Sequence, residues 1–582
     1  MITGEPDSLK AEATAYTACM SPARGTRGAV SSGHQLASLA GLRLLERGGN
    51  AVDAGVAAGL CLNVLQSDFT NLGGVAPTLI FLARERRVVN IDGLGHWPRA
   101  ATLAEFKRRA GDGMPTGVLR TVTPAAAGAW LTALERYGTM TLAEVSEDAR
   151  YYATHGFPMH DFMAALTRTQ EHQYRQWPQN AAIYLPGGRP PRPGEMFRQE
   201  DLGRTLQYLV DKEQAASSKG REACLRAARD AFYKGDLARE MAKFHQAEGS
   251  LLTYEDLAAH EVREEEPVRV AFRDLEVVCC GPWCQGPVLA QMIVMLRNFP
   301  LAHLGHNSPQ YIHFLTEVMK LAFADREAYY GDPKFVDVPL ATLLSDAYAA
   351  RRLKRVDPRR AYPQMPPPGL GERGGASADQ GPTGAPAEGD TSYACAVDAE
   401  GNAFSATPSD IAYTVPVVPG LGIIVSGRGS QSRTDAKHPS VLAPGKRPRL
   451  TPNPGLVLKD GRIFMPWGTP GGDVQPQAML QVLLNIAVFG MEPQAAVEMP
   501  RFATHSFPNS FYPHEYLPNR LCVEASIPER HRRDLAERGH EVVPWPALDF
   551  HAGAVCCIMR DPDTGVLTAA ADPRRESAAV AR

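Results

Sequence analysis

The sequence contains no long hydrophobic run. Residues 1–25 lack the apolar segment of a secretory signal, because Asp7, Lys10 and Glu12 interrupt them. No later stretch approaches the roughly 18 consecutive apolar residues that a membrane-spanning helix needs. We therefore expect a protein without a membrane span, located in the cytoplasm.

The sequence also lacks a bias in charge. Its 61 basic and 64 acidic residues leave a formal net charge of −3, and the two signs are mixed along the chain. We therefore expect neither nucleic acid nor an anionic membrane as a partner. Cysteine is scarce as well: ten in 582 residues, several of them adjacent, indicate reduced thiols rather than a disulfide framework.

Motifs for a metal or a cofactor are missing. The sequence has no His-Glu-x-x-His motif, no phosphate-binding P-loop and no dinucleotide-binding glycine motif. Cys279, Cys280 and Cys284, together with Cys556 and Cys557, lack the paired C-x₂-C spacing of a zinc or redox site. We expect no metal and no cofactor.

What the sequence does contain is two regions with different patterns. Before residue 363, apolar residues recur mainly at helical spacing, and the stretch from Asn50 to Leu65 is almost wholly apolar. From Thr391 on, short β-forming runs separated by turns predominate. Because a helix that is apolar all round must be buried, we predict the α/β class, with helices packed on sheets whose strands come from both regions.

A segment rich in proline, glycine and small polar residues, 363–390, separates the two regions. Such a composition buries too little surface to offset its ordering entropy, so we expect a mobile linker. A plain linker and a processed one both fit this composition. The segment ends at Asp390, and a hydroxyl residue, Thr391, begins the first strand-like run.

We predict that the protein itself cuts the Asp390–Thr391 bond and that Thr391 then becomes an N-terminal nucleophile. A threonine hydroxyl needs a base, and an α-amino group that titrates at about 7.7–8.0 can serve near neutral pH. The tetrahedral oxyanion needs backbone N–H donors, for which Gly471 and Gly472 before a predicted helix are suitable. Taken alone, a threonine at a strand start is usually a β-former and a Gly-Gly pair is usually a turn.

Several blocks, in one order along the chain, resemble the γ-glutamyltranspeptidase family of N-terminal-nucleophile hydrolases. They are Gly48–Ala54, Asn71–Gly74, Ala231–Gly235, Ala324–Arg326, Gly331–Pro333, Pro444–Pro448, Gly468–Gly472, Ala496–Phe502 and Asp572–Arg575. The resemblance implies a four-layer αββα sandwich made of two subunits cut from one precursor. Residues 1–390 would form the large subunit, with the linker 363–390 at its C-terminal end, and 391–582 the small one. Whether such pairs dimerise stays open.

The resemblance also implies roles for individual residues. Thr391 matches the nucleophile, Ser409 a second hydroxyl residue that hydrogen-bonds it, and Gly471 and Gly472 the oxyanion-hole pair. Ser392 stands where the family usually has a second threonine. We therefore expect the catalytic residues of the family to be retained.

The positions that would recognise a glutamyl group depart from the family. Leu94 stands in place of an arginine that holds the α-carboxylate, Ile411 in place of an asparagine, and Leu450-Thr451 in place of a Ser-Ser pair. Loss of a charge-paired arginine alone costs about 1.5–3 kcal/mol of binding. Ordinary γ-glutamyl recognition is therefore not expected.

Other stretches are similar to the acylase and oxamate-amidohydrolase-like branch of the same superfamily. Arg428 falls where transpeptidases carry a polar glutamate-binding residue and is our candidate for a relocated carboxylate anchor; a solvated loop arginine is the alternative. Thr451 and Asp473 belong to stretches shared with this branch and are further candidates for substrate binding. His96, beside Trp97, either lines the pocket or belongs to a buried structural pair.

The expected function is a self-processing amidohydrolase with an N-terminal threonine. It would hydrolyse an amide of a small, carboxylate-bearing acyl group through an acyl-enzyme. Three alternatives stay open: a γ-glutamyl hydrolase or transpeptidase acting on glutathione-like substrates, a C–C bond hydrolase of the same fold in a biosynthetic pathway, and an uncleaved, non-catalytic homologue. Retention of Thr391, Ser409 and the glycine pair argues against the last.

Overall fold

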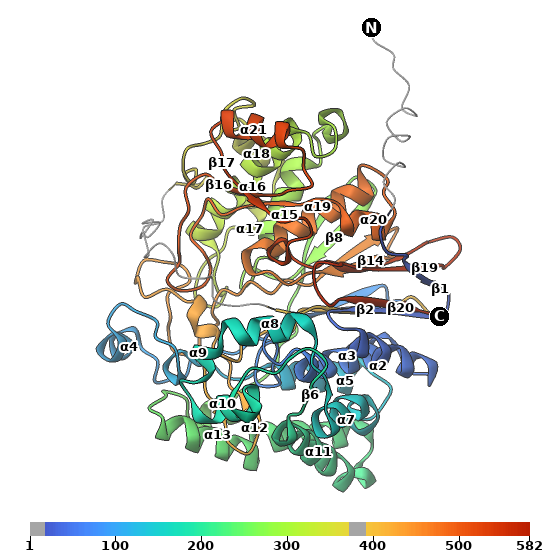
Figure 1. Ribbon diagram of the computed structural model, residues 1–582, viewed down its shortest axis with the longest axis vertical. Coiled ribbons are helices and arrows are strands. Elements are labelled where there is room, and N and C mark those ends of the chain that lie inside the picture. Colours follow the sequence, from blue (N-terminus) through green and yellow to red (C-terminus); the bar gives the residue numbers. More distant parts are fainter. Residues whose placement is uncertain (1–17, 372–390) are drawn as a thin grey trace.

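The computed structural model describes residues 18–371 and 391–582. Two β-sheets lie face to face in the middle of the molecule, and helices cover the outer face of each (Figure 1). The fold class predicted from the sequence, a four-layer αββα sandwich, is confirmed.

The first sheet has six strands, and each pairs with its neighbours in antiparallel fashion. Their order across the sheet is β20 (Ala578–Ala581), β2 (Gly28–Ser32), β9 (Ala394–Asp398), β10 (Ala403–Ala406), β3 (Thr78–Leu82) and β4 (Arg87–Ile91). Strand β9, which begins just after Thr391, therefore lies in the interior of the sheet, between a strand that precedes residue 391 and one that follows it.

The second sheet has seven strands and is also antiparallel. Their order is β1 (Ala23–Gly25), β19 (Leu567–Ala571), β18 (Cys556–Arg560), β14 (Arg462–Gly468), β13 (Gly455–Lys459), β8 (Leu275–Cys279) and β7 (Val268–Phe272). Both sheets thus combine strands from the two sides of residue 391. A core cluster that includes Tyr393, Leu450 and Val278 fills the space between them.

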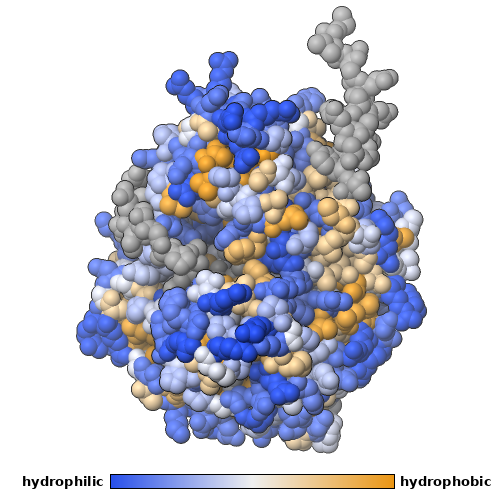
Figure 2. All heavy atoms as spheres, viewed as in Figure 1, coloured by the Kyte–Doolittle hydropathy of each residue, from blue (hydrophilic) through white to orange (hydrophobic). Residues whose placement is uncertain are grey.

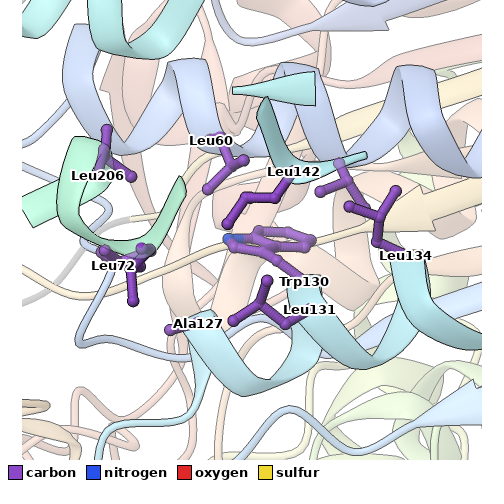
Figure 3. Close-up of a pocket in the computed structure, with 10 residues that line it drawn as sticks. Leu60, Leu72, Ala127, Trp130, Leu131, Leu134, Leu142 and Leu206 are labelled. Carbon is purple, nitrogen blue, oxygen red and sulfur yellow. The ribbon is translucent and has the colours of Figure 1, made fainter. Parts of the chain in front are cut away.

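One helical layer packs on the six-stranded sheet. Its central helix, α3 (Ala51–Leu65), is buried at every position, as its apolar sequence predicts, and Asn50 caps it. Helices α2 (Gln35–Glu46) and α5 (Ala126–Tyr137) lie beside it. Trp130 of α5 packs among leucines beneath α3, where a cavity of about 10 Å³ remains (Figure 3). This apolar cavity is too small for a ligand and belongs to the core.

The other helical layer covers the seven-stranded sheet. It consists mainly of α15 (Gly286–Leu296), α16 (Pro309–Tyr329) and α19 (Gln475–Ala487), which share one core cluster with the sheet. Further elements surround the sandwich: α4 (Leu103–Ala110), α7 (Glu147–His155), α8 (Asp161–Thr169), α11 (Glu200–Ala215), α12 (Arg221–Tyr233), α13 (Asp236–Ala247), α14 (Tyr254–Ala258), α18 (Asp346–Leu353), α20 (Pro493–Glu498), α21 (Glu529–Glu537), β15 (Phe502–Thr504), β16 (Arg520–Glu524) and β17 (Glu541–Trp545).

The expected mobile linker, 363–390, is only partly described. Within 363–371, the Met365 N–H donates to Tyr516 Oη at 2.6 Å, and the Gly369 N–H donates to Asp325 Oδ1 at 2.9 Å. Arg352 Nη1 also donates to the Pro367 carbonyl at 2.8 Å. This part is therefore held in place, because side chains from distant elements satisfy its backbone groups. The rest of the expected linker, including Asp390, lies outside the described residues.

All ten cysteines lie in the described part of the chain, and all are free thiols, of which Cys19 alone is exposed. Across residues 18–371 and 391–582, no helix is both long enough and apolar enough to cross a membrane. On the face that Figure 2 shows, hydrophobic residues form separate patches among hydrophilic ones.

Candidate active site

Thr391 and Ser409 lie side by side at the ends of two paired strands. Thr391 precedes β9, Ser409 follows β10, and the two residues form an isolated antiparallel bridge. Their hydroxyl oxygens are 2.7 Å apart, and both residues are buried, Thr391 with 2% of its surface exposed. The sequence therefore predicts this pair correctly as neighbours.

Arg428 brings a positive charge to this hydroxyl pair. It begins a short 3₁₀ helix, Arg428–Gln431, and is buried. Its Nη2 donates a hydrogen bond to Ser409 Oγ, and its Nη1 lies 3.5 Å from Gln431 Oε1. The guanidinium is thus connected to Thr391 through a single hydroxyl, and the alternative of a solvated loop arginine is wrong.

A buried carboxylate, Asp410, accompanies Arg428. Asp410 Oδ1 lies 4.0 Å from Arg428 Nε and accepts a hydrogen bond from the Gly427 N–H at 3.2 Å. Asp410 Oδ2 accepts another from Ser426 Oγ at 2.5 Å. Burial raises the pKa of Asp410, against the opposing effect of the Arg428 charge. The sequence alone does not indicate a role for Asp410, although it directly follows Ser409.

Gly471 and Gly472 form the turn between β14 and α19. Their φ angles are +116° and +55°, a region that favours glycine. A Cβ atom on Gly472 would lie 3.6 Å from the ring of Phe511, and the guanidinium carbon of Arg428 lies 5.3 Å from the centre of the same ring. Phe511 therefore connects the glycine turn to the Arg428 side of the site.

Asp473, the next residue, is engaged by protein donors. Its Oδ1 accepts hydrogen bonds from Arg326 Nη1 at 2.5 Å and Ser510 Oγ at 2.6 Å. Its Oδ2 accepts one from the Ser510 N–H at 2.7 Å. Arg326 also pairs with Glu327 at 2.8 Å. These contacts fix the position of the chain directly after the glycine turn. Asp473 therefore holds this turn in place.

Thr451 belongs to the Arg428 side of the site. Gln431 Nε2 donates to Thr451 Oγ1 at 3.1 Å, and Gln431 Oε1 faces Arg428. Thr451 is fully buried. Gln431, Phe511 and Arg326 received no role from the sequence. Phe511 and Arg326 lie far along the chain from Arg428 and Asp473, whereas Gln431 is only three positions after Arg428.

His96 contacts a different set of residues. Its Nδ1 lies 3.4 Å from Thr123 Oγ1, and its ring packs against His260 at 5.2 Å between centroids. Burial, followed by the charges of Arg263 and Arg447, lowers the pKa of His96 to about 4. Its neighbour Trp97 instead donates to Ser432 Oγ at 2.9 Å, in the loop that follows Arg428. The contacts therefore favour the structural interpretation of His96.

The three apolar replacements are all buried. Leu94 and Leu450 belong to the core cluster between the sheets, and Ile411 belongs to the cluster beneath the six-stranded sheet. None of them offers a hydrogen bond or a charge from its side chain. The three apolar residues that replace polar residues of the family therefore belong to the hydrophobic core.

Known proteins resemble this chain over most of its length. A family model described as gamma-glutamyltranspeptidase matches residues 37–582. The glutathione hydrolase-like YwrD proenzyme of Bacillus subtilis is 32% identical over 96% of this chain and 98% of its own length. The acylase ACY 1 proenzyme of a Pseudomonas species (strain SE83) is 32% identical over 97% and 95%, and the oxamate amidohydrolase proenzyme of Klebsiella pneumoniae is 30% identical over 95% and 98%.

Solved structures resemble the chain as well. That of LmbA2991HD has a TM-score of 0.91 and 36% identity, and the match covers 97% of this chain and 100% of that one. A cephalosporin acylase from Bacillus halodurans has a TM-score of 0.84 and 28% identity, over 100% and 99% of the two chains. The resemblance inferred from the sequence, including its acylase and oxamate-amidohydrolase side, is confirmed.

Proposed function

The chain belongs to the γ-glutamyltranspeptidase family of N-terminal-nucleophile hydrolases, and from this premise we propose that it cuts itself before Thr391 and then hydrolyses an amide through an acyl-Thr391 intermediate. One observation carries the proposal. Thr391 Oγ1 lies 2.7 Å from Ser409 Oγ, and the buried Arg428 donates to that same oxygen.

Self-cleavage follows from the chemistry of the hydroxyl. Thr391 Oγ attacks the carbonyl carbon of Asp390, the acyl group moves from nitrogen to oxygen, and water hydrolyses the resulting ester. The products are a large subunit that ends at Asp390 and a small one that begins at Thr391. The names of the relatives as proenzymes support this step.

The released α-amino group of Thr391 becomes the general base of the mature enzyme. With a pKa of about 7.7–8.0 in an ordinary environment, part of it is neutral near pH 7.5 and takes the proton of the hydroxyl during attack on the substrate. Because the Thr391 proton passes to the α-amino group, Thr391 Oγ1 acts as an acceptor, and Ser409, which itself accepts from Arg428, donates to it. This arrangement stabilises negative charge that develops on the nucleophile.

We assign the oxyanion-stabilising donors to the backbone N–H groups of Gly471 and Gly472. The turn stands before η6 (Gly472–Val474) and α19, and the ion pair between Asp473 and Arg326 holds it. A fixed donor pair of this kind lowers the barrier because it needs no reorganisation as charge develops.

The proposed substrate is a small molecule whose acyl group is short and bears a carboxylate. Arg428 is only one hydroxyl away from the nucleophile, so an acyl group bound to Thr391 reaches it only if its carboxylate is close to the scissile carbonyl. Gln431 and Thr451 would add polar groups beside Arg428. The oxamate amidohydrolase among the relatives supports such a substrate, whereas the buried Leu94 disfavours a γ-glutamyl group. The cytoplasmic location stays a prediction.

Intact-mass measurement tests the cleavage step. We expect the purified protein to consist of two fragments, the smaller beginning at Thr391, and Thr391→Ala to remain one intact and inactive chain. Thr391→Ser, which keeps a hydroxyl, is the matched control and should still be cut. A fragment that begins at any other residue contradicts the mechanism, and an active full-length chain contradicts the class of enzyme.

Comparing substrates tests the acyl group. A monoamide of a short dicarboxylic acid should be hydrolysed with a higher kcat/KM than a γ-glutamyl anilide. Efficient γ-glutamyl turnover with a dipeptide acceptor would instead favour the transpeptidase alternative.

A further inference from the structure

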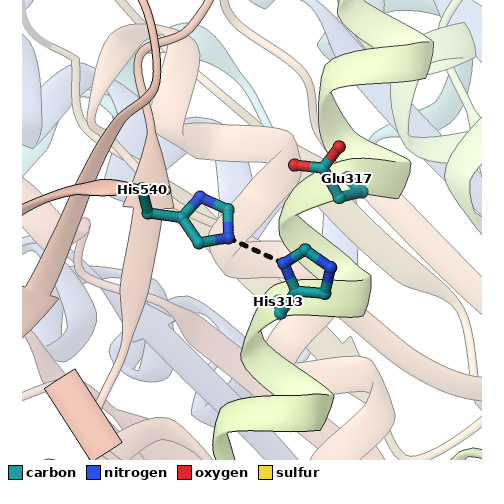
Figure 4. Close-up of side chains that lie close together, drawn as sticks. All are labelled: His313, Glu317 and His540. Carbon is teal, nitrogen blue, oxygen red and sulfur yellow. Dashed lines mark hydrogen bonds between the residues drawn. The ribbon is translucent and has the colours of Figure 1, made fainter. Parts of the chain in front are cut away.

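Outside the candidate active site, three side chains with metal-binding atoms converge on one buried point (Figure 4). His313 and Glu317 come from α16, and His540 comes from the turn between α21 and β17. One ligand atom of each lies within 4.8 Å of the other two. The residues are 1%, 3% and 4% exposed, respectively, so the point is shielded from solvent.

The two α16 residues point the same way because they are four positions apart, about one helical turn. His313 is also oriented for coordination. Its Nε2 lies 2.8 Å from the Asp357 carbonyl, which accepts only, so the ring proton is on Nε2 and the lone pair is on Nδ1. A histidine that donates one ring N–H to a carbonyl and presents the other nitrogen is typical of a metal ligand.

We propose that His313, Glu317 and His540 form a binding site for a divalent metal ion of the zinc type. Two imidazole nitrogens and one carboxylate oxygen are a donor set suited to zinc, and water would take the fourth place. His313 Nδ1 and His540 Nε2 are now 2.8 Å apart and share a hydrogen bond. Tetrahedral zinc places two such nitrogens ~3.3 Å apart, so a small rotation of the rings makes room.

Metal binding requires two rearrangements at this point. His540 must move its proton from Nε2 to Nδ1, which changes the tautomer and not the charge. Glu317 Oε1 must turn from Lys320 Nζ, now 2.8 Å away, toward the metal. Lys320 keeps two other acceptors, the Tyr362 carbonyl at 3.1 Å and Asn519 Oδ1 at 3.0 Å. Lys320 is therefore a competing cation whose removal strengthens the site.

The site joins parts of the chain on both sides of Thr391. His313 and Glu317 precede it, and His540 follows it. The segment from Asp357 to Tyr362 lies against the same point, because the Tyr362 N–H donates to Glu317 Oε2 at 3.0 Å. A bound metal thus holds α16, this segment and the α21–β17 turn together. The proposal concerns structure and does not depend on the proposed cleavage.

Zn²⁺ titration in competition with a chromophoric chelator tests the proposal. Every protein carries Cys19→Ser, since Cys19 is the one exposed thiol in the described ranges and could itself bind Zn²⁺. One set of proteins also carries Thr391→Ala, so that metal binding is measured without cleavage. We expect one Zn²⁺ per chain. His313→Gln and His540→Gln should weaken binding by at least about 100-fold, and Lys320→Met should tighten it by at least about tenfold.

The exposed His172→Gln is the matched control and should bind as the parent does. Thermal unfolding gives a second readout that needs no activity: Zn²⁺ should raise the Tm of the parent but not that of a folded His540→Gln variant. The proposal is overturned if the parent and both histidine variants bind Zn²⁺ equally well. It is also overturned if the parent does not bind Zn²⁺, even if Lys320→Met does. Equal results with and without Thr391→Ala support its independence from cleavage.

Discussion

At the residue scale, the contact between Arg428 and Ser409 gives the guanidinium two separable roles. Through Ser409 it can stabilise charge on Thr391, which would affect every substrate. By itself it can bind a carboxylate, which would affect only acyl groups that carry one. The buried Asp410, 4.0 Å from Arg428 Nε, offsets part of the positive charge.

Replacement of Arg428 distinguishes these roles. If Arg428 anchors the carboxylate, Arg428→Ala should raise KM for a dicarboxylic monoamide by about 10- to 150-fold. This rise corresponds to the loss of a charge-assisted hydrogen bond worth about 1.5–3 kcal/mol. The matched neutral amide should change little. Steady-state kinetics with both substrates measures the difference. An equal fall in kcat for the two would reject the anchor and leave Arg428 as a positioning residue, and Arg428→Lys should restore only part of the loss, because lysine lacks the planar fork.

The residues of the candidate site differ in how far the sequence predicts them. Thr391, Ser409 and the glycine pair are identified through blocks that resemble the family, since taken alone they are not specific, and the first two lie within hydrogen-bond distance of each other. Asp410 and Gln431 lie close along the chain to Ser409 and Arg428, but nothing in the local sequence indicates that they face the Arg428 guanidinium, and Phe511 comes from a distant segment. Asp473 was chosen as a substrate residue, yet its carboxylate is engaged by Arg326 and Ser510.

At the element scale, the turn from β14 to α19 depends on an ion pair that lies outside it. Arg326 belongs to α16, and its contact with Asp473 links that helix to the residue after Gly472. Both side chains are nearly inaccessible, with 0% and 5% of their surface exposed. A buried charge left without its partner is strongly destabilising, typically by 3–5 kcal/mol, so the position of the turn is sensitive to this pair.

Asp473→Asn should therefore impair both stability and turnover. We expect the unfolding midpoint in urea to fall and kcat to fall by at least about tenfold, because the backbone N–H groups of the turn lose their fixed position. Ser510→Ala, which removes one hydrogen bond to the same carboxylate, is the milder control and should cost about 1 kcal/mol. Turnover by a folded Asp473→Asn enzyme at the parental rate would contradict the holding role.

The secondary structure was predictable where its pattern is strong. The almost wholly apolar helix α3 lies where the stretch from Asn50 to Leu65 predicts it, since its pattern is strong. Strand β20, Ala578–Ala581, was missed, because four small residues near the chain end carry little signal until β2 pairs with them. Residues 363–371 have the composition of a linker for a related reason: their hydrogen-bond partners, Asp325 on α16, Arg352 on α18 and Tyr516, lie outside the segment.

At the scale of the whole molecule, several histidines are buried and neutral. His245 on α13 is fully buried, and its ring nitrogens have no hydrogen-bond partner within the described residues. Burial lowers its pKa from 6.5 to about 3. Between these two values the unfolded chain binds more protons than the folded one at this residue, so stability falls as the pH falls through that window.

Replacement of His245 should reduce this acid sensitivity. We expect His245→Leu to gain stability relative to the parent by up to about 1.4 kcal/mol for each pH unit below 6.5, because the neutral side chain has no proton to take up. Urea unfolding midpoints at pH 7.5, 6 and 5 measure the difference between the two proteins. The exposed His172→Leu is the control. A difference that stays constant across the three pH values would show that His245 does not contribute to the pH dependence.

The strand order of the two sheets determines what the proposed cut does to the physical behaviour of the enzyme. Strand β9 lies between β2 and β10, and β8 pairs with β13, so strands from before and after Thr391 share ladders in both sheets. Neither piece keeps a complete sheet without the other. The two pieces therefore cannot separate without unfolding: dilution should leave specific activity unchanged, and fragments produced from two separate genes should become active only when they fold together.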